Sequence, residues 1–230
     1  MIEFSKHDVN KYTNSTVFGT GYLAYRDVNK LIVELQLEPK RALDLGCGCG
    51  RSITLLQEIC GTVTGCDTNK LALQNARHAH PDIELFLNDL SCTKYPSERF
   101  DSIFSFLMFF HFDSIESMRI ELSRCYESLN DGGFLFVVHG NHSLSTASYT
   151  SVQGVSSPPE KEGDRFKVLL KNINLVVEDT YWTADTIMRE CEKIGFKFNK
   201  LHEPLGDKSD GQPYIDEYIK PPYFYLVMTK

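Results

Sequence analysis

The stretch Arg41-Ala42-Leu43-Asp44-Leu45-Gly46-Cys47-Gly48-Cys49-Gly50-Arg51 decides how this chain folds. A short apolar segment runs directly into three glycines at every second position. A helical pattern of apolar residues follows at once, at Ile53, Leu55, Leu56 and Ile59. Glycine lets the backbone occupy places where a side chain would collide. A strand, a glycine turn and a helix start in this order predict a ligand cradle at the carboxyl end of a parallel strand.

The glycine spacing separates three kinds of nucleotide loop. A dinucleotide-binding loop has the pattern G-x-G-x-x-G, whereas this loop reads G-x-G-x-G and Arg51 stands in the place of the third glycine. A phosphate-binding Walker loop is excluded because no Gly-Lys-Ser/Thr follows. A nicotinamide-dependent oxidoreductase is therefore the weaker interpretation of this loop.

The segment Leu43–Gly50 resembles the first motif of class I S-adenosylmethionine-dependent methyltransferases. Cys49 stands where that motif usually has Thr, Ser or a small residue. The resemblance implies S-adenosyl-L-methionine as the cofactor. It also implies a set of cofactor-binding residues in the loop: Asp44, Gly46, Cys47, Gly48 and Gly50.

Two further strand ends carry the resemblance. The small and β-branched residues of 61–66 predict a strand that ends at Asp67, and Thr68 begins the turn into a helix. The resemblance implies that Asp67 binds the ribose of the cofactor, although a dinucleotide fold also uses an acid here, and Thr68 is expected to bind the cofactor beside it. The strand predicted over 83–87 ends at Asn88-Asp89-Leu90, which the resemblance assigns to the adenine.

The segment 99–111 resembles the fourth strand of the same family and the loop after it. Ser105 and Phe106 are expected at the cofactor, with the residues up to His111 lining cofactor and substrate. A helix is predicted to begin at Asp113-Ser114 and to end by glycine capping at Asn130-Asp131-Gly132-Gly133. The continuous apolar run 134–138 predicts a buried fifth strand.

The whole chain of 230 residues is predicted to form one α/β domain. We expect a Rossmann-like, seven-stranded, mostly parallel sheet with helices on both faces and an antiparallel last strand. Residues 1–30 are expected to form a cap over the cofactor, with Arg26 meeting its carboxylate. Residues 140–182 are expected to form a flap insertion over the acceptor, built on antiparallel strands at 166–170 and 175–182. Thr183 should cap a helix over 184–194, and strands should follow at 196–201 and 223–228.

Composition limits the possible partners. A net charge of −7 argues against a nucleic-acid substrate, which needs a basic groove. The longest apolar run, 103–110, is too short to cross a bilayer, and the first residues lack the pattern of a signal peptide. Seven cysteines, an odd number, indicate reduced thiols and a cytoplasmic protein. No metal is expected, because Cys47-x-Cys49 has no second cysteine pair at zinc-ribbon spacing.

The predicted function is methyl transfer to oxygen or nitrogen of a small molecule. A general base is needed only for a hydroxyl or a protonated amine. His139, at the end of the fifth strand, and His111 are the catalytic candidates, with His142 as a further possibility. The alternative is a catalytically inactive S-adenosylmethionine-binding regulatory or partner subunit.

Overall fold

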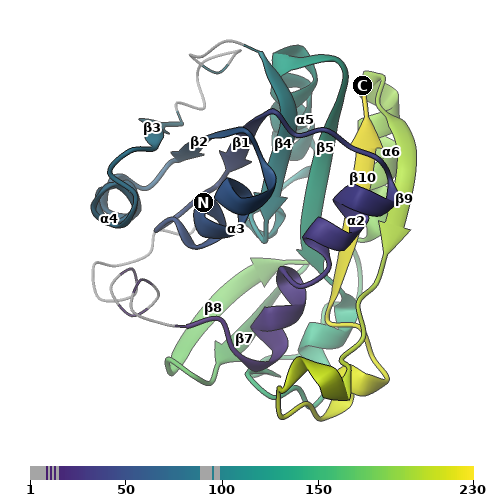
Figure 1. The fold of residues 1–230 in the computed structure, drawn as a ribbon. Helices are drawn as coiled ribbons and strands as arrows, with labels where there is room; N and C mark the ends of the chain where they lie inside the picture. The colour runs from purple at the N-terminus through teal and green to yellow at the C-terminus, as the bar shows by residue number, and fades with distance from the viewer. Residues whose placement is uncertain (1–8, 10, 12, 14–15, 89–94, 96–98) are drawn as a thin grey trace.

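The computed structural model describes residues 9, 11, 13, 16–88, 95 and 99–230. Its main sheet has seven strands in the order β3-β2-β1-β4-β5-β10-β9 (Figure 1). These strands are β1 Arg41–Leu45, β2 Thr62–Asp67, β3 Glu84–Leu87, β4 Phe100–Phe106, β5 Leu129–Gly140, β9 Lys197–His202 and β10 Tyr223–Thr229. The β3-β2-β1-β4-β5 ladder is parallel, and β10 runs antiparallel to both β5 and β9. The predicted sheet, including its antiparallel last strand, is confirmed.

Helices cover both faces of this sheet. The helices are α2 Val28–Glu34, α3 Arg51–Ile59, α4 Lys70–Ala79, α5 Ile115–Ser128 and α6 Ala184–Ile194. Successive side chains of a strand point to opposite faces, so Phe134 and Phe136 of β5 pack in the cluster that includes α2 and α3. Leu135 and Val137 pack in the other cluster, which includes α5 and α6. No helix in the described part of the chain has the length and apolar character needed to span a membrane.

The helix ends follow the sequence signals in two cases and depart from them in a third. Thr183 accepts a hydrogen bond from the Thr186 N–H, so the predicted cap of α6 is confirmed, and α5 begins within the predicted segment 113–114, with Ser114 accepting from the Ser117 N–H as its N-cap. The predicted glycine cap of α5 is wrong. The helix stops at Ser128, Leu129 is already extended, and Gly132 and Gly133 lie inside β5. Gly133 is needed there because a Cβ atom would lie 3.0 Å from the Asp101 carbonyl oxygen of β4.

A second, smaller sheet is inserted after β5. It consists of β6 Val152–Gly154, β7 Arg165–Leu170 and β8 Leu175–Thr180, all antiparallel, and it lies below the carboxyl end of β5 in Figure 1. The predicted strand pair is confirmed, while β6 was not foreseen and β8 ends two residues before Trp182. Strand β8 packs against the short 3-10 helix η2, Phe109–His111. The Trp182 indole N–H donates to the Phe112 carbonyl at 3.0 Å.

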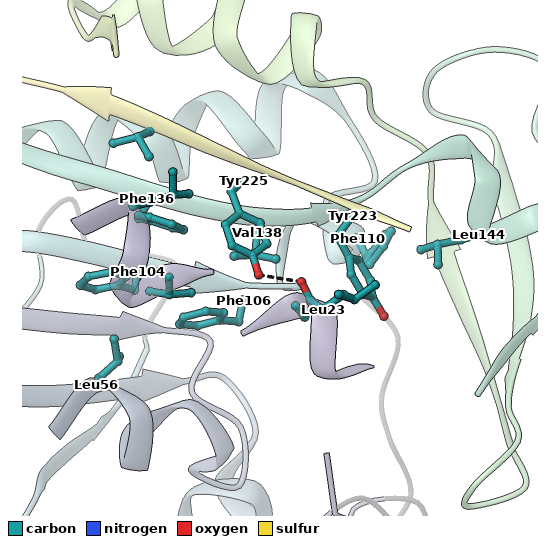
Figure 2. Packing of buried hydrophobic residues seen from close by; sticks show 14 of the residues in the cluster. Leu23, Leu56, Phe104, Phe106, Phe110, Phe136, Val138, Leu144, Tyr223 and Tyr225 are labelled. Atoms are coloured by element: carbon teal, nitrogen blue, oxygen red, sulfur yellow. Dashed lines mark hydrogen bonds between the residues drawn. The ribbon is translucent and has the colours of Figure 1, made fainter. Parts of the chain in front are cut away.

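One hydrophobic cluster joins the two sheets. It runs from Phe104 and Phe136 in the main sheet to Phe110 and Leu144 beside the insertion (Figure 2). The Tyr225 hydroxyl crosses this cluster to donate to the Leu23 carbonyl at 2.6 Å, drawn as the dashed line in Figure 2. Leu23 belongs to the 3-10 helix η1, Gly19–Ala24. The N-terminal part, the main sheet and the insertion therefore share a single core.

The remaining connections are short 3-10 helices. These are η3 His142–Ser145 after β5, and η4 Lys208–Asp210 and η5 Asp216–Tyr218 between β9 and β10. Buried Glu217 joins this last connection to distant segments. Its carboxylate accepts hydrogen bonds from the Thr20 hydroxyl and from the Thr150 backbone N–H, each at 2.7 Å. The long loop before β10 thus holds η1 and the start of the insertion together.

Candidate active site

A cavity of about 820 Å³ lies at the carboxyl ends of the parallel strands. One end is formed by the loops after β1, β2 and β3. The middle is formed by 106–113, and the other end by one face of the second sheet. Open α/β sheets bind their ligands at this edge. The predicted site residues are therefore expected to line this cavity.

The three glycines of the loop have different tasks. Gly46, Gly48 and Gly50 all have positive φ, at 78°, 52° and 89°. A Cβ on Gly46 would lie 2.6 Å from Met108 Cγ, and one on Gly50 would lie 2.7 Å from a ring carbon of His80. A Cβ on Gly48 would meet nothing within 4 Å. Gly46 and Gly48 line the cavity, so the backbone at Gly48 lies open to a ligand, as a cofactor cradle requires.

Asp44 and Cys47 lie behind the loop and are absent from the cavity wall. Asp44 is fully buried, and its carboxylate accepts a hydrogen bond of 2.5 Å from the Ser52 hydroxyl at the start of α3. Burial raises the pKa of Asp44 to about 7. Cys47 is also buried, and the neighbouring Cys49 lines the cavity in its place. The structure thus places Asp44 where it supports the loop from beneath.

Asp67 connects the glycine loop to the next loop. One carboxylate oxygen accepts from the Gly48 N–H and the other from the Asn69 N–H, each at 2.8 Å. Asp67 and Thr68 both line the cavity beside Gly48. Asp67, for which the resemblance implies a ribose contact, therefore lies together with Thr68 and the open glycine.

Asn88 lines the cavity after β3 and belongs to a buried polar network. Its side-chain oxygen accepts from Arg124 at 2.8 Å, and Arg124 also pairs with Glu121 at 2.8 Å. The Tyr95 hydroxyl donates to Glu121 at 2.6 Å. Glu121 reaches the cavity from α5 and was missed, because nothing in the sequence says which face of α5 meets the loop after β3. The predicted sites Asp89 and Leu90 lie outside the described residues.

Of the two residues predicted to contact the cofactor at the end of β4, Ser105 and Phe106, only Phe106 lines the cavity. Phe106 lines the cavity and stacks on Tyr25 of the N-terminal part, with ring centroids 5.1 Å apart. Ser105 is fully buried and points away from the cavity wall. This split follows from strand geometry, since neighbouring residues of β4 face opposite sides of the sheet.

Arg26 does not reach the cavity wall. Its guanidinium pairs with Asp27 at 2.8 Å and with Asp210 at 2.6 Å, and it also donates to the Leu205 carbonyl. The hydrogen bond to Asp27 is the largest of the effects that hold the pKa of Arg26 above its ordinary value. In this arrangement Arg26 joins the start of α2 to the loop after β9, and it is not placed to meet a cofactor carboxylate.

The three histidines have separate positions. His111 lines the cavity, and burial lowers its pKa below the ordinary value. His139 is fully buried between Phe110 and Phe224, at centroid distances of 4.2 and 5.5 Å, and does not line the cavity. Neither of its ring nitrogens has a hydrogen-bond partner among the described residues, and burial lowers its pKa to about 3. His142 does not line the cavity, and its Nε2 atom lies 3.0 Å from the Pro159 carbonyl oxygen, with which it shares a hydrogen bond.

The far end of the cavity is formed by the second sheet. Val152, Val168, Leu170 and Val177 make it an apolar surface, and Asp179 is the acid within it. Sequence reasoning missed this residue. The signal was the adjacent pair Glu178-Asp179 inside a predicted strand, which must place one acid on each face. Among the described residues, no group of three or more His, Cys, Asp or Glu side chains is arranged to hold a metal ion.

Comparison with known proteins agrees with this geometry. Residues 43–137 match a family model described as a methyltransferase domain, and this segment contains the glycine loop, Asp67, Asn88 and Phe106.

Several solved structures are similar in fold at low identity. An S-adenosylmethionine-dependent methyltransferase from Mesorhizobium loti has a TM-score of 0.66 and 18% identity, over 92% of this chain and 100% of that one. CalS10, an amino pentose methyltransferase from Micromonospora echinaspora solved with S-adenosylmethionine bound, has a TM-score of 0.63 and 15% identity, over 100% and 98%. DesVI from Streptomyces venezuelae has a TM-score of 0.63 and 17% identity, over 98% and 99%.

The sheet order, the open glycine cradle beside Asp67 and the matched methyltransferase domain all indicate the same activity. Residues 43–137 form a methyltransferase domain and the chain has the fold of solved S-adenosylmethionine-dependent methyltransferases, which indicates an S-adenosylmethionine-dependent methyltransferase with S-adenosyl-L-methionine as its cofactor.

Proposed function

We propose that this enzyme methylates an oxygen or nitrogen atom of a small molecule. One observation carries the proposal: the cofactor cradle at Gly48 and the apolar chamber under the second sheet belong to the same cavity. Its volume of about 820 Å³ is in the range of sites for small ligands, roughly 300–1,000 Å³. A macromolecular acceptor would instead need an extended surface groove.

The cofactor, when bound, supplies a methyl group on a positively charged sulfur. The chain's own residues must hold an acceptor in line with that methyl group and keep water away. The segment 106–113 stands between the cradle and the chamber and contributes Phe106, Phe110 and Phe112 to the wall. These aromatic side chains give the reacting atoms an apolar surrounding.

His111 is proposed to act as the general base when the group that receives the methyl must lose a proton. It lies on the cavity wall in the same segment, and its lowered pKa keeps the ring neutral near pH 7. A neutral imidazole can take a proton directly. His139 has no comparable access, because Phe110 and Phe224 enclose its ring.

The N-terminal part is proposed to close the cavity from the open side. Val9 lines the cavity, and the Lys11 ammonium donates to the Asn174 carbonyl of the β7–β8 turn at 3.1 Å. The Thr13 hydroxyl lies 3.0 Å from Cys49 Sγ and accepts from Asn75 of α4 at 2.9 Å. These contacts reach both ends of the cavity, which supports the predicted cap.

The test is a transfer assay that measures S-adenosylhomocysteine release from the purified chain. It is offered panels of small alcohols, phenols and amines, with histone peptides and duplex DNA as macromolecular controls. Release with small molecules alone is the expected result. Tight binding of S-adenosylmethionine without release in any panel would instead support the inactive, cofactor-binding subunit.

A further inference from the structure

The second sheet presents one acid on an apolar face. Phe166, Val168 and Leu170 of β7 pair with Asp179, Val177 and Leu175 of β8, and residues in register share a face. Val168, Leu170, Val177 and Asp179 all line the cavity, and Phe166 packs on Phe110. A strand with one buried face alternates apolar and polar residues, and Asp179 occupies an apolar position of that pattern.

The Asp179 side chain lies almost fully buried, with 6% of its surface exposed, and it lines the cavity. Its carboxylate makes no hydrogen bond or ion pair with any other residue that the structure describes. Burial, with a smaller contribution from Glu178, raises its pKa to about 7. A buried carboxylate without a partner destabilises the fold, so a ligand that pairs with it gains that interaction on binding.

The neighbouring acid shows what an ordinary strand carboxylate does here. Glu178 lies on the outer face of β8, where Arg165 donates to it at 2.9 Å, and its side chain is one third exposed. The two acids are consecutive in the chain and occupy opposite faces of β8. Arg165 satisfies the outer acid, whereas no described cation lies beside the inner one.

The charges along the cavity wall select the sign of the ligand. The described wall contains four acids, Asp67, Asp113, Glu121 and Asp179, against a single lysine or arginine, Lys70 at the start of α4. Glu121 is paired with Arg124, but the others keep the wall negative. A carboxylate or phosphate group would be repelled from this chamber, and a cation would be attracted.

We propose that the methyl acceptor carries an amino group on an apolar body, and that Asp179 binds this group in its ammonium form. The inference deepens the proposed function and rests on it. An ammonium group has three N–H donors and a positive charge, so it pairs fully with a carboxylate. A hydroxyl group has one donor and no charge, and would leave Asp179 with a weaker partner. The apolar body would lie on Val152, Val168 and Val177.

Matched pairs of fragments test the proposal on the full chain saturated with S-adenosylhomocysteine. Cyclohexylmethylamine is compared with cyclohexylmethanol, and benzylamine with benzyl alcohol, by calorimetry. The wild type should bind each amine about tenfold more tightly than its alcohol, or better, because charge-assisted hydrogen bonds are the stronger kind. Asp179→Asn, which keeps the shape of the side chain, should lose this preference.

Glu178→Gln is the matched control, since it removes the adjacent acid on the opposite face and should keep the preference for amines. Affinity for S-adenosylhomocysteine should be equal in all three proteins, which also shows that the variants are folded. An amine that binds no better than its alcohol to the wild type, including the case in which neither binds, would overturn the inference. So would an undiminished preference in Asp179→Asn.

The calorimetry and the transfer assay together distinguish failure of the amine inference from failure of the proposed function. A wild type that binds S-adenosylhomocysteine and methylates alcohols as well as amines keeps the proposed function and loses the amine inference. A wild type that fails to bind S-adenosylhomocysteine at all overturns both.

Discussion

At the cofactor end the cavity wall depends on backbone, whereas at the acceptor end it consists of side chains. Gly46, Gly48 and the Asp67 turn come from one short part of the chain and are joined by a direct hydrogen bond between Asp67 and Gly48. The chamber under the second sheet combines 106–113 with residues from β6, β7 and β8. A backbone cradle tolerates almost no change of residue, because the absence of a side chain is what makes it. A side-chain chamber can change its specificity one residue at a time.

The largest expected effect is at the cradle. Gly48→Val should abolish S-adenosylmethionine binding in calorimetry, because the new side chain would occupy open space in front of the backbone. It also strains a positive φ at a cost of about 1–2 kcal/mol. Gly132→Val is the control, since Gly132 also has a positive φ and open space but lies at the start of β5. If both variants lose S-adenosylmethionine binding equally, the loss would reflect general destabilisation of the fold and not a filled cradle.

Substitution of His111 in the middle of the cavity should lower the rate of methyl transfer. His111→Gln is expected to lower the rate by about 10²–10⁴-fold with an acceptor that must lose a proton, and to leave cofactor affinity nearly unchanged. His139→Phe should keep turnover, since its ring already lies between Phe110 and Phe224 and its nitrogens bond to no described residue. Loss of activity in His139→Phe with activity retained in His111→Gln would return the role of base to His139.

A smaller effect is expected at the ribose position. Asp67→Ala removes the partner of the Gly48 and Asn69 N–H groups as well as the proposed partner of the cofactor. Hydrogen bonds to a charged group contribute about 1.5–3 kcal/mol each, so affinity should fall by about tenfold or more. Asp82→Ala removes an exposed acid before β3 and should leave the affinity as it is. An Asp67→Ala variant that binds S-adenosylmethionine like the wild type would contradict the assignment.

Substitution of Asp179 at the acceptor end should change the stability of the fold rather than the affinity for the cofactor. Burial raises the folded-state pKa of Asp179 from 3.8 to about 7, so between these values the folded chain keeps a proton that the unfolded chain releases. The contribution of Asp179 to the free energy of unfolding therefore falls as pH rises through that window, by at most about 1.4 kcal/mol per pH unit. Asp179→Asn should be more stable than wild type at pH 8, and the difference should vanish near pH 4. Denaturant unfolding of wild type and Asp179→Asn at both pH values measures the difference.

Sequence patterns predicted the main sheet because its signals are local. The glycine loop, the acids at strand ends and the continuous apolar run of β5 each depend on a few neighbouring residues. Asp67, Thr68, Asn88 and Phe106 were placed on the cavity wall for the same reason. The end of α5 was misjudged because two glycines near a helix end predict a cap, whereas here Gly133 serves the close approach of β4.

The rest was decided by tertiary contacts. Arg26 had a plausible place near the cofactor, but Asp210, a residue far along the chain, holds it elsewhere. His139 ends a strand at the expected edge, yet the aromatic rings of Phe110 and Phe224 enclose it.

The sequence by itself predicted the end of the cavity beside the glycine loop, because a loop glycine and an acid at the end of a strand can be recognised from neighbouring residues alone. Only the tertiary structure decided the acceptor end. Whether Asp179 or Glu178 faces the cavity depends on how β8 pairs with β7 and packs against η2, and a shift of one residue would exchange the two acids. The identity of the charged group at the acceptor end is therefore a property of strand register, which no local pattern encodes.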